Sequence, residues 1–183
     1  MASHLPPELS ASLAARLAPF EALDSCHRDV MAQLQTLARL VNHLSQHGVD
    51  EQARRLARAV MAFFSTQAHQ HHAEEERVVF PPLLAGDDVE LIQHVRRLQQ
   101  DHGWLEEDWH ELALQLGAVA DGYSWYDLDS LRNGVEVYTA LYHDHIALEE
   151  SLIYPQARRA LNQEAEGIGR RLAQRQRDTA ARL

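Results

Sequence analysis

Hydrophobic residues recur every three to four positions along most of the chain, and this spacing is typical of amphipathic α-helices. Strand-like alternation of single polar and apolar residues is nearly absent. Four long segments carry a continuous apolar stripe, and they cover about residues 20–47, 50–80, 87–117 and 127–155. The pattern therefore predicts an all-α protein.

Residues that begin and end helices stand at the edges of these segments. Aspartates that can cap a helix precede the last three segments, at Asp50, at Asp87 or Asp88, and at Asp127 or Asp129. We expect Gly48 and Gly117 to end the first and third helices, and Pro81-Pro82 and Pro155 to end the second and fourth. Four helices joined by short loops predict an up-down-up-down four-helix bundle.

The bundle leaves a segment at each end of the chain. Residues 1–19 predict a polar, alanine-rich N-terminal arm with room for a short helix, and residues 20–156 predict the bundle. Residues 157–183 are rich in arginine and predict a C-terminal helix or tail. A solvated helix that covers acidic surface is the simpler interpretation, and a tail that binds nucleic acid or a protein partner is the alternative.

One sequence motif occurs twice. Residues 71–81 read HHAEEERVVFP, and residues 145–155 read HIALEESLIYP. Both contain His, three residues, Glu-Glu, two residues, an aliphatic residue, an aromatic residue and Pro. We expect the proline to stop the helix and the aliphatic and aromatic residues to fill the core. Neither role explains the His and the Glu.

The first His and first Glu of each motif copy continue the apolar stripe of their helix. Residues four apart share one face of a helix, so His71 points with Glu75 and His145 points with Glu149. Both pairs are therefore expected to face the core.

Two further histidines, His27 and His102, lie on the stripes of the first and third helices, so each helix places one His inward. In an up-down bundle, residues equidistant from a turn lie at the same level. The midpoints between successive inward histidines fall at position 49, between 86 and 87, and between 123 and 124, which all lie in predicted turns. We therefore expect the four histidines in one layer of the core, with Glu75 and Glu149 about one turn away.

Six ionisable groups in one buried layer are costly without partners, and the two carboxylates repel each other. Bound cations remove both costs, because borderline metals accept imidazole and carboxylate ligands together. Four His and two Glu are too many ligands for one tetrahedral zinc. They suit two octahedral ions, each with two His, two bridging oxygens and about two positions left for water, an oxo bridge or a small ligand. Carboxylate-bridged sites in helical bundles hold di-iron or di-manganese.

Other residues repeat parts of the motif. His72 and Glu76 have the same spacing one position round the helix, and we expect this pair at the helix edge. Glu106 follows His102 by four residues but lacks the aromatic-Pro ending, so it is a weaker candidate ligand. The remaining candidates are expected in packing or surface roles: Tyr138 and Tyr142 in the core, Cys26 as a buried thiol, and His69, His94, His110 and His143 at the surface.

Composition narrows the class of protein. The 183 residues include 12 His and no Lys, and the formal net charge is −10. This acidity argues against a nucleic-acid surface, which needs clustered cations. No apolar run approaches the roughly 20 residues that span a bilayer, and no secretory signal is visible. With a single cysteine, Cys26, these features predict a cytoplasmic protein that binds neither nucleic acid nor membrane.

The motifs resemble the hemerythrin family, in its HHE cation-binding branch. The resemblance covers about residues 20–156 and is most specific at residues 22–27 (ALDSCH), 71–81 and 145–155. It implies a four-helix bundle around a non-haem di-iron centre with two bridged ions, as Fe2+ or Fe3+; manganese and zinc accept the same ligands. The implied metal ligands, carried over position by position, are His27 and His71 on one iron, His102 and His145 on the other, and Glu75 and Glu149 as bridges.

The sequence departs from the oxygen-carrying hemerythrins, whose ligands are five His, one Glu and one Asp. Leu98 stands four residues before His102, where those proteins have a further His. Glu149 follows His145 by four residues, where those proteins have an Asp after five. The set of four His and two Glu is more similar to that of bacterial iron-centre repair proteins.

The resemblance implies a protein that binds or senses a small ligand, namely O2, NO or peroxide, or that holds exchangeable iron for stress response or repair. A small di-iron oxidoreductase that acts on peroxide, O2 or NO is the alternative. A helical interaction protein with a hydrogen-bonded His-Glu core is a third interpretation. The sequence singles out no catalytic residue, and a homodimer through an outer helix face is compatible with the pattern.

Overall fold

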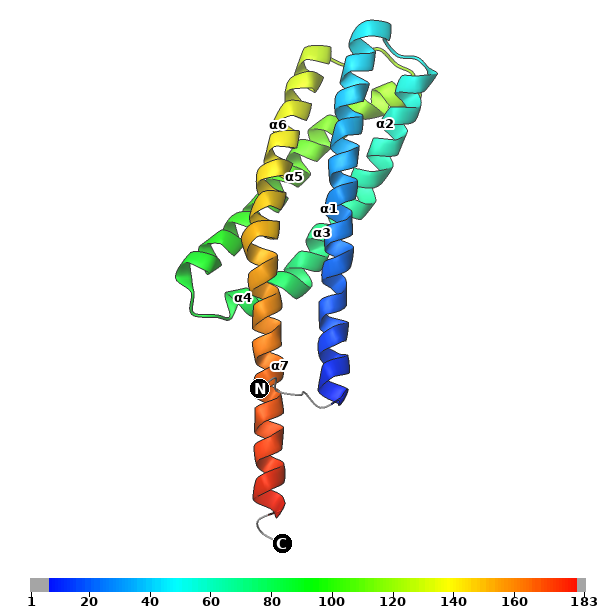
Figure 1. Ribbon diagram of the computed structural model, residues 1–183. Coiled ribbons are helices and arrows are strands. Elements are labelled where there is room, and N and C mark those ends of the chain that lie inside the picture. Colours follow the sequence, from blue (N-terminus) through cyan, green and yellow to red (C-terminus); the bar gives the residue numbers. More distant parts are fainter. Residues whose placement is uncertain (1–6, 181–183) are drawn as a thin grey trace.

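The computed structural model describes residues 7–180, and within this range it consists of helices and turns without a strand. Its long helices form a bundle (Figure 1): α1 (Pro7–His47), α2 (Glu51–Phe63), α5 (Val89–Asp121) and α6 (Leu128–Leu148). Neighbouring helices along the chain run in opposite directions and are joined by short turns. The predicted all-α bundle is confirmed. None of the described helices combines the length and the apolar character needed to cross a membrane.

The second and fourth rods of the bundle contain π-helical turns. The second rod continues after α2 as η1 (Phe64–Ala68), α3 (His69–Glu74), η2 (Glu75–Val79) and α4 (Phe80–Leu84). The fourth continues after α6 as η3 (Glu149–Ile153) and α7 (Tyr154–Ala180). Thus η2 and η3 each begin at the first Glu of a copy of the motif. π-Helical turns are rare and frequently occur at functional sites.

The expectation that prolines end these two rods is wrong. Pro81 lies in the first turn of α4 and Pro155 in the first turn of α7, and both helices continue. A helix tolerates proline in its first turn, where the missing N–H is not required. A π-helical turn precedes each proline. In it, the N–H of the residue just before the proline bonds to the carbonyl five residues back, Phe80 to Glu75 and Tyr154 to Glu149.

The chain ends are helical as far as the structure describes them. α1 begins at Pro7, so residues 7–19 continue the first helix, while residues 1–6 and 181–183 lie outside the described range. α7 packs along the N-terminal part of α1 and extends past it (Figure 1). Arg158 of α7 pairs with Asp24 of α1 at 2.8 Å. The arginine-rich segment is therefore a helix up to residue 180.

Two glycines adopt the left-handed backbone that favours this residue at helix ends. Gly48 ends α1, as expected, with φ of +68°. Gly117, however, lies inside α5, which continues to Asp121 and ends at Gly122 with φ of +91°. The helix N-termini are capped by the side chains of Asp50, Asp88 and Asp127, each of which accepts a backbone N–H.

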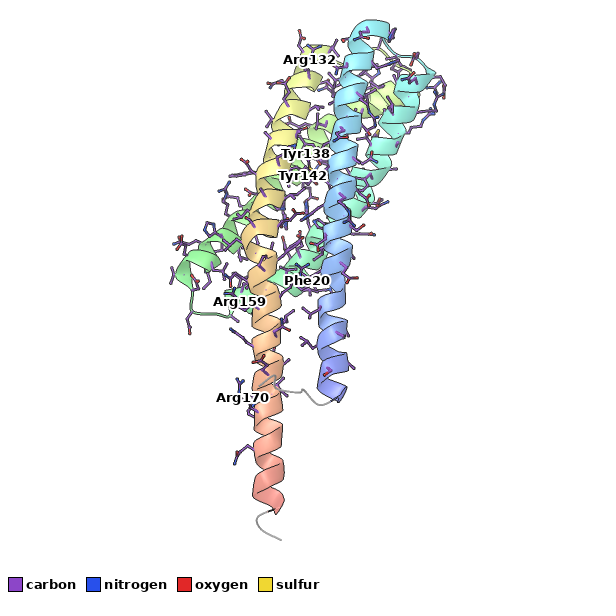
Figure 2. The ribbon with its side chains drawn as sticks, viewed as in Figure 1. Phe20, Arg132, Tyr138, Tyr142, Arg159 and Arg170 are labelled. Carbon is purple, nitrogen blue, oxygen red and sulfur yellow. The ribbon has the colours of Figure 1, made fainter. Side chains whose placement is uncertain are left out.

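A layer of buried polar side chains divides the core into two apolar clusters. Tyr138 belongs to one cluster and Phe20 to the other, and Figure 2 shows them at different heights of the bundle. In α5, His102 lies between Leu98, which belongs to the cluster of Phe20, and Leu105, which belongs to the cluster of Tyr138. The histidine therefore lies between the two clusters. Such a layer is stable only if its charges find partners.

Candidate metal centre

The polar layer brings together the six residues that the sequence analysis expected at one level. Every rod of the bundle contributes, and the side chains are at most 6% exposed: His27, His71, Glu75, His102, His145 and Glu149. The imidazoles approach in pairs. The ring centroids of His27 and His71 are 4.7 Å apart, and those of His102 and His145 are 4.9 Å apart.

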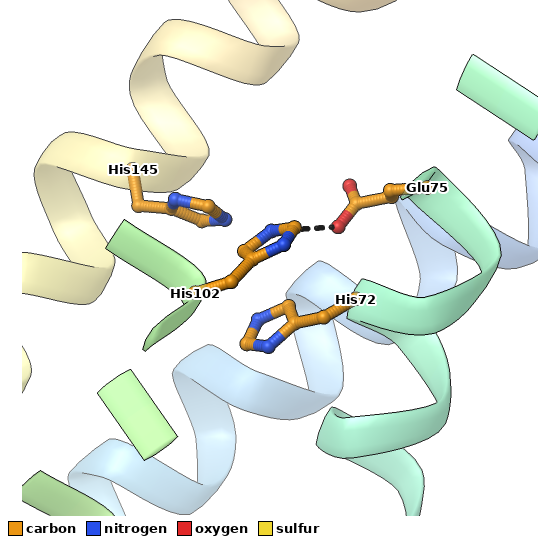
Figure 3. A group of neighbouring side chains, drawn as sticks. All are labelled: His72, Glu75, His102 and His145. Atoms are coloured by element: carbon orange, nitrogen blue, oxygen red, sulfur yellow. Dashed lines mark ion pairs between the residues drawn. The ribbon is translucent and has the colours of Figure 1, made fainter. Parts of the chain in front are cut away.

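The layer contains two groups of side chains that could each hold a cation. Site A consists of His27, His71, Glu75 and Glu149, and site B consists of His72, Glu75, His102 and His145. Within each site the ligand atoms lie within 4.8 Å of one another. Figure 3 shows the three imidazoles of site B and the carboxylate of Glu75 pointing toward one another, with His72 and Glu75 on one rod and His102 and His145 on two others. Glu75 belongs to both sites.

Glu75 directs one carboxylate oxygen to each site. Its Oε1 lies 3.5 Å from Nε2 of His71, and its Oε2 lies 3.4 Å from Nε2 of His102. Burial and the neighbouring charge of Glu149 raise the pKa of Glu75 to about 7. The protein alone therefore balances the negative charge of this carboxylate poorly, and a cation would stabilise the charged form.

Glu149 has the same relation to the two sites. Its Oε2 lies 3.2 Å from Nε2 of His27, and its Oε1 lies 3.1 Å from Nε2 of His145. Burial alone would raise the pKa of Glu149, but the contacts with His145 and His27 outweigh it and hold this pKa well below its usual range. Both glutamates therefore reach from one site to the other, as a bridging carboxylate must.

The imidazoles differ in protonation. Burial lowers the pKa of His71 to about 3, so this ring is neutral at pH 7. Burial also disfavours a charge on His145, but Glu149 and Asp101 outweigh it and raise the pKa of His145 to about 10. In the metal-free layer, a proton on His145 thus balances the negative charge of Glu149. Because an imidazole binds metal in its neutral form, a cation would take the place of this proton.

The second Glu of each motif copy holds an imidazole of another helix, a role that the sequence analysis did not identify. Oε1 of Glu76 lies 2.9 Å from Nδ1 of His102, and Oε1 of Glu150 lies 3.0 Å from Nδ1 of His27. A carboxylate at Nδ1 accepts its N–H and leaves the Nε2 lone pair free for a metal. The Glu-Glu pair therefore supplies one group inside the layer and one that orients a histidine.

The expectation for His72 is wrong, because this residue lies within site B and not at the helix edge. Its ring stacks on that of His102, with centroids 4.1 Å apart and planes inclined by 13°. It also meets the ring of His145 edge-on at 5.5 Å. The π-helical turn η1, which ends at Ala68, explains the difference: the wider turn rotates the residues after it relative to a regular α-helix.

Unsatisfied polar atoms test whether the layer suits a cation. Among the residues that the structure describes, nearly all buried side-chain nitrogen and oxygen atoms without a hydrogen bond belong to sites A and B, and Gln33 Oε1 is the exception. They include Oε2 of Glu75, both carboxylate oxygens of Glu149, and Nε2 of His102 and His145. Buried polar atoms normally have partners. The donor set and its unpaired atoms therefore fit metal ions.

Tyrosines surround the layer on two sides. Tyr138 and Tyr142 pack in the core with centroids 5.0 Å apart, and Tyr142 reaches within 6.0 Å of the His72 ring. Tyr154, which the sequence analysis assigned to core packing, approaches more closely: its hydroxyl donates a hydrogen bond to Glu75 Oε1.

The weaker candidates lie outside both sites. Glu106 is exposed. Cys26 is half-buried, and burial together with nearby Asp29 raises its pKa to about 12, so it is a protonated thiol at pH 7. Four other candidate histidines lie at or near the surface, with His69, His110 and His143 exposed and His94 half-buried.

A pocket of about 210 Å³ adjoins site B. Its inner wall includes His72, Tyr142 and the apolar side chains of Phe64 and Trp109. The wall also includes exposed residues, namely His69, Glu106 and His110. A cavity of this size beside the imidazoles has room for a small molecule.

Comparisons with known proteins agree with this geometry. The Hemerythrin HHE cation binding domain matches residues 18–157. A protein of Haemophilus influenzae, described as uncharacterized, is 29% identical over 134 residues, which cover 73% of this chain and 76% of that protein. No solved structure shows a significant match.

Proposed function

The chain belongs to the hemerythrin HHE cation-binding family, and from this premise we propose that its buried layer is a non-haem dinuclear centre whose natural metal is iron. The observation that carries the proposal is the pair of buried carboxylates, Glu75 and Glu149, each with one oxygen toward site A and one toward site B. A single cation would use only one oxygen of each. Two cations would use all four and remove the repulsion between the carboxylates.

The proposed ligands follow from the two groups of side chains. They are His27 and His71 in site A, His72, His102 and His145 in site B, and Glu75 and Glu149 as bridges. Site A then has two nitrogens and two oxygens, and site B has three nitrogens and two oxygens. An octahedral ion would keep about two open positions in site A and one in site B.

We propose that the centre binds or senses O2, NO or peroxide, or holds iron in exchangeable form. When bound, iron supplies a redox-active Lewis acid with positions open to a small ligand. The chain contributes a buried, largely apolar setting and the pocket beside His72, whose wall includes Phe64, Trp109 and Tyr142. The open position in site B, beside this cavity, supports a small-ligand role.

An oxidoreductase that acts on the same small molecules is the second candidate. The observation in its favour is that Tyr138 and Tyr142 both line the pocket beside site B, where a phenol could donate a proton to a bound molecule. Turnover of peroxide, O2 or NO faster than free iron would support it.

Anaerobic reconstitution with Fe2+ tests the proposed function. We expect about two iron ions per chain by metal analysis, and a change in absorption and electron paramagnetic resonance when NO is added in stoichiometric amounts. Glu106→Gln, at an exposed position in neither site, should bind the same amount. Glu75→Gln should lose at least one ion, because it removes the charge shared by both sites. Metal-free protein after reconstitution would contradict the proposal and favour a helical interaction protein.

A further inference from the structure

The two copies of the repeated motif build the layer with approximate twofold symmetry. In the first copy, Glu75 enters the layer and Glu76 holds His102 of α5. In the second, Glu149 enters the layer and Glu150 holds His27 of α1. His72 adds a third imidazole to site B, and the remaining arrangement is symmetric unless another residue differs between the two copies.

The aromatic residue of the motif is a second difference between the two copies. Phe80 stacks on His102 with ring centroids 5.6 Å apart and planes inclined by 19°. Its counterpart Tyr154 stacks on His27 with centroids 5.3 Å apart and planes inclined by 11°. The two rings therefore have the same packing role, but Tyr154 carries a hydroxyl group that Phe80 lacks.

The Tyr154 hydroxyl lies at site A. It donates a hydrogen bond to Oε1 of Glu75, the oxygen that faces His71, and it lies 3.1 Å from Nε2 of His27. Glu149 cannot receive the equivalent bond from Phe80. One bridging carboxylate is thus held by a phenol on the site A side, and the other is not.

Burial keeps this bond strong. Tyr154 is 1% exposed and Glu75 is fully buried, so water does not compete for either group. Hydrogen bonds to ionised acceptors in such surroundings are stronger than neutral ones, and they fix orientation.

We propose that Tyr154 is a positioning residue that presents Glu75 to site A, and that it thereby raises the affinity of this site alone. The inference rests on the proposed dinuclear function and goes beyond it, because it assigns part of the affinity of site A to one hydroxyl group that has no counterpart at site B. Removing a group that orients a metal ligand typically costs 10–100-fold in affinity. Removing this hydroxyl should therefore weaken site A and leave site B nearly unchanged.

Cobalt titration of the metal-free protein tests the inference. Co2+ binding to Tyr154→Phe is followed by calorimetry and visible absorption. The control is Tyr126→Phe, because that half-buried tyrosine packs against the apolar cluster of Tyr138 and belongs to neither site. We expect two binding events in the wild type. In Tyr154→Phe, one of them should weaken about 10–100-fold, and in Tyr126→Phe both should stay within about twofold.

Two further variants show at which site the weakened binding of cobalt occurs. With His102→Ala, which disables site B, Tyr154→Phe should still weaken the remaining event. With His27→Ala, which disables site A, it should have no effect on the remaining event. The variant Phe80→Tyr adds a hydroxyl on the opposite side, beside His102, and should raise the affinity of site B.

Five results would overturn the inference. If the wild type binds two ions and Tyr154→Phe changes neither affinity, the inference alone fails. It also fails if both affinities fall together, or if Tyr126→Phe has the same effect, since either result indicates a general effect on packing. A phenolate-to-iron charge-transfer band that disappears in Tyr154→Phe would show direct ligation instead of positioning. A wild type that binds no cobalt overturns the dinuclear function itself, and this inference with it.

Discussion

Glu150 accepts a hydrogen bond from Nδ1 of His27 at 3.0 Å, although 123 residues separate them in the sequence. The contact joins η3 to α1 and aims the other nitrogen of His27 at Glu149. Glu76 and His102 repeat it on the opposite side of the layer at 2.9 Å. Each copy of the motif thus reaches outside its own rod to orient a histidine that the motif does not contain.

Replacing one of these orienting carboxylates should weaken one metal position. We expect Glu150→Gln to lower the affinity of site A about 10–100-fold, because His27 loses the acceptor that fixes its Nδ1–H, and Glu76→Gln to do the same at site B. Calorimetric titration with Co2+ measures both. Glu106→Gln removes an exposed carboxylate outside both sites and serves as the control. Equal affinities in all three variants would mean that these bonds do not matter for metal binding.

His72 provides a second test. If it is a ligand of site B, His72→Ala should weaken that site at least tenfold, within the range measured when metal-site partners are removed. His69→Ala, three residues earlier on an exposed part of the same helix, should have no effect. Metal titration of both variants distinguishes the two roles. A His72→Ala protein with wild-type affinity would mean that the His72 ring packs beside His102 without binding metal.

The regular part of the centre follows from helical periodicity, and this is why the sequence predicts it. His71 with Glu75, and His145 with Glu149, are four residues apart, so their common direction depends only on the helix that contains them. Turn positions then set the four histidines at one level. These arguments need no knowledge of how neighbouring helices are rotated.

The other members of the centre depend on such rotations or on irregular backbone. The bond from His102 to Glu76 exists because two rods turn particular faces toward each other, which spacing within either rod does not specify. His72 enters site B after the π-helical turn η1, and Pro155 follows the turn η3 without ending its rod. A π-helical turn leaves no clear pattern of hydrophobic residues, so regular periodicity misplaces the residues after it.

The stability of the metal-free protein should fall as pH rises above neutrality. His145 has its pKa raised to about 10 in the folded protein, against 6.5 for an ordinary histidine, and the pKa of His27 is also raised, because contacts with Glu149 outweigh the effect of burial. The folded state therefore keeps protons that the unfolded chain has released. The resulting stabilisation is complete below pH 6.5 and is lost on approach to pH 10, at up to about 1.4 kcal/mol per pH unit for each group.

Urea unfolding at about pH 6, 8 and 9.5 measures this loss in metal-free protein. Metal-loaded protein should not show it, because neutral imidazoles hold the cations and no proton is bound there to lose. In metal-free His145→Gln the dependence should be weaker. An unfolding free energy that rises over this pH range in the metal-free wild type would contradict the charge distribution described for the layer.

The pocket beside site B should control access of small ligands. Ala113 is half-buried in its wall, and Ala113→Leu would narrow the cavity without touching either site. We expect NO binding to the iron-loaded variant to slow several-fold while the iron content is unchanged. The matched control is Ala32→Leu, in a separate pocket that reaches His27 of site A. Stopped-flow rates identify the route, and slowing in the control alone would place it on the site A side.

The dinuclear arrangement is tested most directly by anomalous diffraction from crystals of the iron-reconstituted protein at the iron edge. The account predicts two peaks inside the bundle, one among His27, His71 and the two glutamates, and one among His72, His102 and His145, with Glu75 and Glu149 in contact with both. A single peak, or no peak within this layer, would contradict it.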